Sequence, residues 1–438
     1  MSLEILGLVL IGVLFIAILG GFPISFTLIF LAMAFGYYGL GERVFHLMTY
    51  QYFSTMMETV LAAVAMFTFM GYILENAGLM GRLFHAIQIL FGRMHGSLYL
   101  GTILTATLFA AATGIVGASV TIIGLMAGPV MKKKGYDTAL SAGTICAGGT
   151  LGILIPPSVM LVVMGPAFQV SISRLYAAAI LPGLLLSFIY ITYTMTRTWL
   201  NPKLGPSLTA KELDVPTSQL IRELVVGLVP PVVLIVSTLG TIVTGWATPT
   251  EGAAIGCLGA IVITAAHGRL TFQVLKTATF RTAETSSMVM ILLAASTFMG
   301  SVFSAFGTPQ FLAEMLLSWN IPAWLLIFSI LAVCFLLGWP LEWVPIVVII
   351  VPIFLPLLHA LHVDMIWFSI LLAVTLQTCW LSPPVALSAY YLKGVVPGWK
   401  LWDIYRGMMP FMYLQAACVV VLYFFPQITL ALPNLWYK

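Results

Sequence analysis

Residues 148–158 read Gly-Gly-Thr-Leu-Gly-Ile-Leu-Ile-Pro-Pro-Ser and interrupt an apolar run with helix-breaking residues. The three glycines lower helix stability, and the two prolines lack amide donors and push the preceding residue out of helical geometry. We therefore expect an unwound segment at mid-membrane depth, whose unpaired carbonyl oxygens are suited to a hard cation such as Na⁺. A proline kink that serves helix packing alone is the competing interpretation.

The same kind of break recurs in the second half of the chain. Residues 377–382 read Gln-Thr-Cys-Trp-Leu-Ser and lead into Pro383-Pro384, 227 positions after Pro156-Pro157. Thr-Phe-Met-Gly occurs at 68–71 with a further glycine at 78, and again, 229 positions later, at 297–300 with a glycine at 307. One internal repetition of hydrophobic sequence, with helix breakers at matching places, is typical of a two-repeat membrane transporter. The repetition also argues against a kink that serves packing alone.

The composition excludes a water-soluble protein. Only 7% of the 438 residues are charged and 61% are apolar, whereas a soluble domain carries about 25% charged residues. The apolar stretches are near the length of about 20 residues that crosses a bilayer as helix, and they lack the alternation of a membrane β-barrel. The first of them is expected to be a retained helix and not a signal peptide. The small, scattered net charge of +4 does not suggest nucleic-acid binding.

We therefore expect an all-α polytopic membrane protein with two repeats, each with a re-entrant hairpin and a broken helix. The first repeat covers residues 1–200, with its hairpin at about 97–131 and its broken helix at about 137–168. A cytoplasmic linker follows at 201–222. The second repeat covers 223–438, with its hairpin at about 321–358 and its broken helix at about 364–393. Other spanning helices are expected at about 3–20, 22–41, 57–76, 171–197, 224–241, 247–267, 283–303 and 402–427. Irregular backbone at membrane depth is tolerated only where protein or a water-filled cavity surrounds it, so the hairpins are expected to be functional.

Lys and Arg residues set the expected orientation. With the N-terminus outside, five spans and one hairpin per repeat place basic residues such as Lys132–Lys134, Arg197 and Arg281 in the cytoplasm. Both termini then lie outside, and the odd number of spans makes the repeats inverted. The amphipathic pieces Met80–Arg93 and Leu270–Arg281 are expected to lie along the membrane interface.

Two hairpin tips face the two predicted breaks. The first tip, 113–121, is rich in small and hydroxyl residues, which permit close backbone approach and supply oxygen ligands. The second, 338–343, carries Glu342, the only carboxylate between Glu314 and Asp364. A carboxylate at membrane depth is a functional candidate, although a hairpin-tip residue that reaches water is the simpler alternative. With no cationic side chain expected at mid-membrane, an anion would be held by half-helix N-termini, hydroxyls and bound cations.

Four motifs together resemble the large membrane subunit (the DctM-like permease) of a tripartite ATP-independent periplasmic (TRAP) transporter. They are Lys132–Asp137, Gly149–Ser158, Ala247–Ala254, and Leu376–Thr378 leading into Pro383-Pro384. The resemblance implies a bacterial inner-membrane protein with an elevator mechanism and at least two coupling Na⁺ ions, so that the outside termini expected from the basic residues would be periplasmic. It also implies a small four-helix membrane subunit and a periplasmic substrate-binding protein that delivers an organic acid.

The resemblance also implies which residues form the sites. The first Na⁺ site would comprise Thr113, Gly114, Gly117, Ser119, Gly152, Ile155 and Pro157. The second would comprise Gly338, Glu342, Gln377, Thr378, Cys379, Trp380, Ser382 and Pro384. Ser119, Ser158 and Glu342 would border the substrate.

The chain departs from the family pattern at three places. Many members have a serine-rich first tip where this chain has Ile115-Val116-Gly117, and Asp where Glu342 stands. Many also have Thr-Pro-Pro-x-Gly where residues 382–386 read Ser-Pro-Pro-Val-Ala. Such a changed site suits a small or unusual anion, such as a sulfonate.

The function expected from these features is Na⁺-coupled import of a small organic acid anion, a carboxylate or a sulfonate. A standalone ion-coupled anion transporter or channel, working without a binding protein, is the alternative. An enzyme is not expected, because no histidine lies at mid-membrane depth to act as a base and no metal-like cluster accompanies the apolar cysteines.

Overall fold

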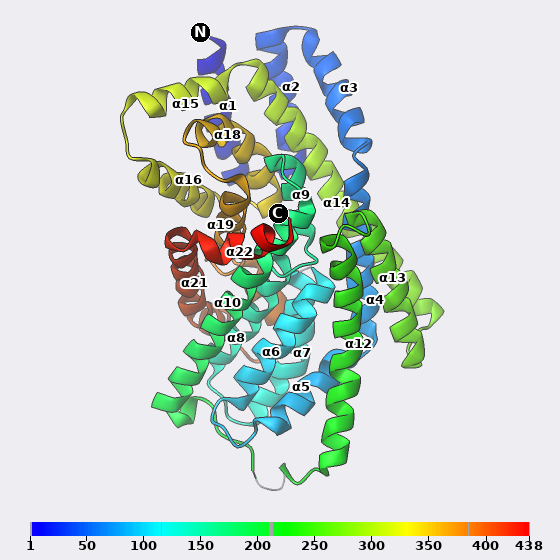
Figure 1. Cartoon of the computed structure of the whole chain (residues 1–438). Coiled ribbons are helices and arrows are strands. Elements are labelled where there is room, and N and C mark those ends of the chain that lie inside the picture. Colours follow the sequence, from blue (N-terminus) through cyan, green and yellow to red (C-terminus); the bar gives the residue numbers. More distant parts are fainter. Residues whose placement is uncertain (1, 115, 210–212, 384, 438) are drawn as a thin grey trace.

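The structure of the chain is a computed structural model that describes residues 2–114, 116–209, 213–383 and 385–437, with the side chains of 110–113 left out. Within these ranges every regular element is helical (Figure 1). In the described part of the chain, seven helices are long and apolar enough to cross a membrane, and several shorter apolar helices accompany them. The protein is therefore an all-helical, multi-pass membrane protein.

The helices follow one another in the order α1 (Leu3–Leu19), α2 (Ile24–Leu40), α3 (Arg43–Met56), η1 (Thr59–Leu61), α4 (Ala62–Asn76), α5 (Leu79–Leu90), α6 (Ser97–Thr113), α7 (Val116–Lys133), α8 (Thr138–Thr150), η2 (Leu151–Ile153), α9 (Val159–Phe168) and α10 (Ile172–Leu200). They continue with η3 (Pro202–Leu204), α12 (Thr217–Val243), α13 (Pro249–Ala266), α14 (Phe272–Ala305), α15 (Thr308–Ser318), α16 (Ala323–Leu337), α17 (Trp343–Pro345), η4 (Ile346–Ile350), α18 (Val351–Ala360), α19 (Met365–Gln377), η5 (Thr378–Trp380), α20 (Leu387–Val395), α21 (Leu401–Phe424) and α22 (Pro426–Trp436).

The internal echoes fall at matching points of these elements. Gly78 and Gly307 adopt left-handed backbone, with φ of 71° and 72°, and each precedes the next short helix, α5 or α15. The stretch from the start of α3 to the end of α4, residues 43–76, becomes 272–305 when displaced by 229 positions, and these are the bounds of α14. The segment that forms two α-helices, α3 and α4, in the first half of the chain therefore forms the single helix α14 in the second half.

Both broken helices start and break in the same way. Asp137 and Asp364, 227 positions apart, cap α8 and α19 by accepting bonds from the amides of Leu140 (2.7 Å) and Trp367 (2.9 Å). Each helix tightens into a 3₁₀ turn, η2 or η5, and then loses helical structure before α9 or α20 begins. After each break a serine hydroxyl, from Ser158 or Ser388, donates to the carbonyl that ends the 3₁₀ turn. Helix breakers at matching positions therefore give matching local structure.

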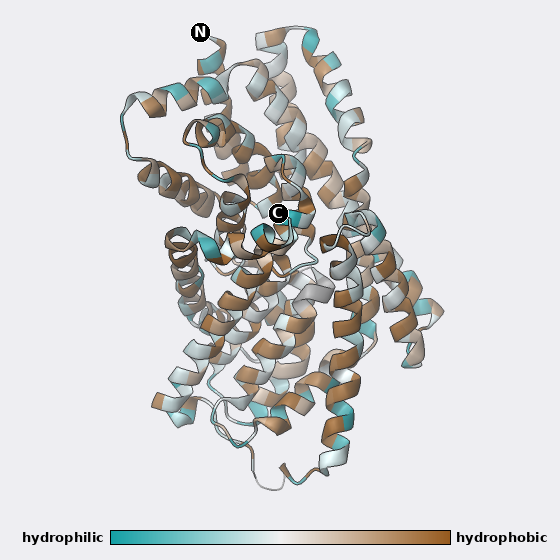
Figure 2. Cartoon of the chain, in the orientation of Figure 1, coloured by the Kyte–Doolittle hydropathy of each residue, from teal (hydrophilic) through white to brown (hydrophobic). Residues whose placement is uncertain are grey.

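The broken helices form the centre of the protein. All residues of α8 from Leu140 to Thr150 are buried, and α21 packs along that helix. Glycine permits this contact, because a Cβ added to Gly407 would lie 1.8 Å from the carbonyl oxygen of Ala139. By contrast, α12 and α13 leave large apolar side chains exposed, and Figure 2 shows them brown along much of their length. These outer helices are suited to lipid or to another membrane protein.

The two amphipathic pieces expected at the membrane interface differ in their surroundings. Residues 272–281 form the start of α14, which at 34 residues is about 51 Å long. Among them Ala278 alone is buried, and Phe272 and Phe280 are 81% and 67% exposed. By contrast, α5 buries eight of its residues and packs against α6 and α12. Neighbouring helices therefore cover the apolar face of α5, whereas the interfacial position of residues 272–281 stays a prediction.

The predicted linker at 201–222 is shorter than expected, because α12 already begins at Thr217. Its first part is docked on the protein by backbone bonds. Leu208 donates to the Gly92 carbonyl at 2.8 Å, and the carbonyl of Leu204 accepts from the Asp137 amide at 3.0 Å. Three further helices, α3, α15 and α22, were not expected at all.

Candidate functional site

A cavity of about 440 Å³, the central cavity, lies where the two hairpins meet. Residues of both hairpin tips and both helix breaks line one side of it. Residues of α4 and α14 line the other side. Its lining residues are Thr68, Tyr72, Glu75, Gly114, Val116, Gly117, Ala118, Thr121, Ile153, Val159, Arg281, Glu284, Thr285, Met288, Val289, Glu342, Trp343, Val344, Trp380 and Tyr391. The arrangement joins segments from both halves of the chain in one site.

The first tip packs directly on the first break. Gly114 has a φ of +62°, and a Cβ added there would lie 3.7 Å from the carbonyl oxygen of Pro157 and 3.9 Å from the amide nitrogen of Val159. Gly149 lets α7 approach more closely still, because an added Cβ would lie 2.3 Å from the Cγ2 atom and 3.1 Å from the amide nitrogen of Val120. The small residues of the tip therefore bring backbone polar groups of two segments together.

The second tip packs on the second break through another glycine. A Cβ at Gly338 would lie 1.9 Å from the Sγ atom of Cys379, so only glycine fits without a shift. Nearby, the Ser382 hydroxyl donates to the Thr378 carbonyl at 2.7 Å and lies 3.1 Å from the sulfur of Met412. Tip and break thus form one packed unit in each half of the chain.

Gln377, at the end of α19, carries an unusual side chain for such a position. The residue is fully buried, and neither its amide nitrogen nor its amide oxygen has a hydrogen-bond partner among the described residues. A buried polar group without a partner costs about 1–3 kcal/mol. The side chain is therefore placed to interact with a bound ion, water or ligand.

The residues expected to form the sites divide into three groups. Gly114, Gly117, Glu342 and Trp380 line the central cavity. Buried positions around it, outside its lining, are Ser119, Gly152, Ile155, Pro157, Ser158, Gly338, Gln377, Thr378, Cys379 and Ser382. The side chain of Thr113 and the whole of Pro384 lie outside the described residues.

Of the three expected substrate residues, Glu342 alone borders the central cavity. Ser158 is fully buried, and its hydroxyl donates to the carbonyl of Ile153. Ser119 is only 2% exposed, on the buried side of α7. Neither serine is therefore part of the lining of the central cavity.

Sequence reasoning missed the charged wall of the central cavity. Arg281, expected in the cytoplasm, lines the cavity from α14 and lies 3.9 Å from Glu75, with 55% of its side chain exposed. Its guanidinium also lies 5.8 Å from the centre of the Tyr72 ring, and the Tyr72 hydroxyl bonds that of Thr285 at 3.1 Å. The spacing of Arg281, Thr285 and Met288 along one helical face would have revealed this wall, had the helix been extended backward.

Comparisons with known proteins point to one family. The family model described as "Tripartite ATP-independent periplasmic transporter, DctM component" matches residues 11–428. The chain is 29% identical over 385 residues to the C4-dicarboxylate TRAP transporter large permease protein DctM of Pseudomonas aeruginosa, covering 87% of this chain and 88% of that protein. It is 27% identical over 421 residues to the sialic acid TRAP transporter large permease protein SiaM of Vibrio cholerae, covering 95% and 96%.

A third relative and one solved structure extend the picture. The isethionate TRAP transporter permease protein DctMQ of Oleidesulfovibrio alaskensis is 29% identical over 370 residues, which cover 84% of this chain and 57% of that protein. The crystal structure of the YdaH transporter of Alcanivorax borkumensis matches with a TM-score of 0.62 at 16% identity, covering 89% of this chain and 90% of that one. At that identity the likeness concerns the fold alone.

Proposed function

Because the chain belongs to the DctM components of the TRAP transporters, we propose that it is a permease for Na⁺-coupled import of a small organic acid anion. A periplasmic binding protein delivers the anion, and a small four-helix membrane subunit completes the transporter. One observation carries the proposal: both hairpin tips and both helix breaks meet at a single cavity. Such convergence of broken helices at a repeat interface is the usual form of a transporter site.

The bound cations are proposed to lie where each tip packs on its break. At the first, the carbonyl of Pro157 lies near Gly114, and carbonyl oxygens are suitable ligands for a hard cation. At the second, the unpartnered amide of Gln377 supplies an oxygen that no described residue satisfies. Two Na⁺ ions are therefore expected, one for each tip.

The substrate is proposed to bind in the central cavity. By their names, the relatives transport C4-dicarboxylates, isethionate or sialic acid, all of which are carboxylates or sulfonates at neutral pH. Arg281 is half exposed, and its contact with Glu75 is long for an ion pair. Its planar fork is well suited to a carboxylate or sulfonate. We therefore assign Arg281 to the anion, with Glu342 on the opposite, tip-bearing wall.

The mechanism follows from the repetition of elements. The hairpins and broken helices would move together past α4 and α14, as in an elevator, with the two repeats inverted in the membrane. With the N-terminus periplasmic, the central cavity opens toward the cytoplasm. Na⁺ entry down its gradient drives accumulation, because each charge that crosses contributes about 2.3 kcal/mol per 100 mV.

Uptake into proteoliposomes tests the proposal. The chain is reconstituted with its small subunit, and accumulation of labelled anion is measured with and without the binding protein, under a Na⁺ or a K⁺ gradient. Accumulation is expected only when the binding protein and the Na⁺ gradient are both present. Uptake without the binding protein would favour the standalone transporter, and uptake that is indifferent to Na⁺ would refute the coupling. A thermal-shift screen of the binding protein against carboxylates and sulfonates identifies the anion to use.

A further inference from the structure

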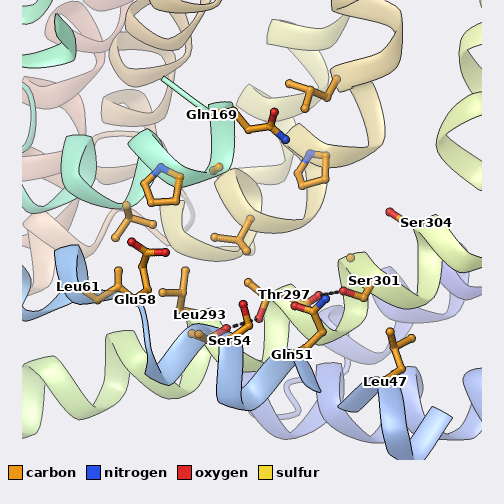
Figure 3. A pocket seen from close by; sticks show the side chains of 18 residues that line it. Leu47, Gln51, Ser54, Glu58, Leu61, Gln169, Leu293, Thr297, Ser301 and Ser304 are labelled. Carbon is orange, nitrogen blue, oxygen red and sulfur yellow. Dashed lines mark hydrogen bonds between the residues drawn. The ribbon is translucent and has the colours of Figure 1, made fainter. Parts of the chain in front are cut away.

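A second cavity, larger than the first, lies farther along α14. Its volume is about 540 Å³, and it is bounded by α3 and the second half of α14 on one side and by α9 and α18 on the other. Figure 3 shows Gln51, Thr297 and Ser301 close together on the first wall and Gln169 on the other, across the open space. Apart from Glu58, its lining residues are uncharged.

The walls of the two cavities correspond through the internal repeat. Thr297, Gly300, Ser301 and Ser304 line the second cavity, and 229 positions earlier stand Thr68, Gly71, Tyr72 and Glu75. Three of those four residues line the central cavity. The part of α4 that lines the central cavity therefore corresponds, in the internal repeat, to the part of α14 that lines the second cavity.

The remaining elements exchange in the same sense. In the central cavity, the first half of α14 lies beside α4. The first half of α14 corresponds to α3 in the internal repeat, and α3 lies beside the second half of α14 in the second cavity. The opposite side is built from α7 and α20 in the central cavity and from α18 and α9 in the second. In each pair the first-named helix, α7 or α18, is the second arm of a hairpin. The other helix, α20 or α9, follows the helix break in the opposite half of the chain.

The two first walls also share a detail of bonding. The Tyr72 and Thr285 hydroxyls bond at 3.1 Å across the wall of the central cavity, and the Thr55 and Thr297 hydroxyls bond at 3.1 Å across the wall of the second. In both places a hydroxyl pair joins α14 to its neighbour. The second cavity is therefore a counterpart of the central one and not a packing defect.

The tips distinguish the two cavities, because Glu342, Gly114 and the other described tip residues line the central cavity and do not line the second. We propose that the second cavity is the other access chamber of the transport path, and that Gln51, Thr297, Ser301 and Ser304 face the anion in the alternate conformation. This inference rests on the proposed function. In that conformation the tips face these four residues, as they now face Tyr72 and Arg281 across the central cavity.

The two chambers differ in their charged groups. The described lining of the central cavity carries one guanidinium, from Arg281, and three carboxylates, from Glu75, Glu284 and Glu342, whereas Glu58 is the one charged residue in that of the second. In the second chamber the anion would therefore be held by neutral hydroxyl and amide donors, which bind an anion more weakly than a guanidinium does.

A bulky substitution tests the proposal directly. Ser301→Trp fills the second chamber without touching the central cavity, and at least a tenfold loss of uptake is expected. Ile291→Trp is the matched control, since Ile291 lies on the same helix, 41% exposed and outside the linings of both cavities. Its uptake should stay within twofold of the unmodified chain. Normal uptake by a folded Ser301→Trp transporter would overturn the inference.

Thiol labelling decides the matter if the bulky variant fails to fold. Ser301→Cys, reconstituted with its partner subunits, is treated with a membrane-impermeant maleimide, and labelling of the unmodified chain, which has the half-buried Cys257, is subtracted. Anion plus Na⁺ should slow labelling at least threefold relative to Na⁺ alone. An unchanged rate, in a preparation that takes up anion normally, refutes the second chamber and leaves the proposed function standing. Loss of binding-protein or Na⁺ dependence in the unmodified chain is the separate sign that the proposed function fails.

Discussion

The contact between Gly338 and Cys379 gives the sharpest prediction, for the variant Gly338→Ala. The added Cβ would lie 1.9 Å from the Cys379 sulfur, whereas ordinary contacts begin at 3.4 Å, so tip and break must separate by about 1.5 Å. Cys379 is 8% exposed and has little room to turn away. Overpacking of this kind costs about 1–3 kcal/mol. If the contact forms part of a Na⁺ site, the Na⁺ concentration for half-maximal uptake should rise about 5- to 150-fold.

Two further variants make this measurement decisive. Gly394→Ala adds the same atom to a helical glycine with nothing within 4 Å, and its Na⁺ dependence should match that of the unmodified chain. Cys379→Ala removes the clashing sulfur, so the double variant Gly338→Ala/Cys379→Ala should recover part of the lost affinity, a coupling that a double-mutant cycle measures. The reasoning fails if Gly338→Ala transports with an unaltered Na⁺ dependence.

Three other predictions follow from single side chains. Gln377→Leu should raise stability without Na⁺ by about 1–3 kcal/mol, because a buried unpaired amide is removed, and should reduce stabilisation by Na⁺ to the part that the first site supplies; thermal unfolding in NaCl and KCl measures both, and an undiminished Na⁺ shift contradicts the assignment. Arg281→Gln should lower uptake at least tenfold, since a charged hydrogen bond contributes about 1.5–3 kcal/mol; Arg281→Lys should retain more activity, and native uptake by the glutamine variant would exclude Arg281 from the anion site. Thr248→Ala breaks the capping box in which Thr248 and Glu251 exchange hydrogen bonds and should lower stability by about 0.5–2 kcal/mol without changing the Na⁺ response. The exposed control Thr244→Ala should leave both the stability and the Na⁺ response unchanged.

The sequence was most informative where backbone chemistry is local. The two double prolines and their flanking glycines predicted two breaks because proline and glycine act on helices wherever they occur. The motif at 247–254 likewise has a local explanation: Thr248 caps α13, with Pro249 at its first turn. The family follows from these motifs together, and the family model confirms it.

Residues whose role depends on tertiary structure were harder to find. Arg281 was expected to precede a span that starts at residue 283, yet α14 begins at Phe272 and places Arg281 in the lining of the central cavity. The family resemblance placed Ser158 beside the substrate, yet its side chain is fully buried and its hydroxyl donates to the Ile153 carbonyl. Hydropathy reports how apolar a segment is, but not which neighbours surround each face.

The unbroken helix α14 also fixes a length. Thr285 belongs to the wall of the central cavity and Thr297 to that of the second, and twelve residues separate them on one rigid axis. At 1.5 Å per residue the two chambers are offset by about 18 Å. A transported anion that visits both must be carried through that distance, whatever its identity. One inserted residue would lengthen the stroke by only about 1.5 Å, but it would rotate one wall by about 100° away from its cavity.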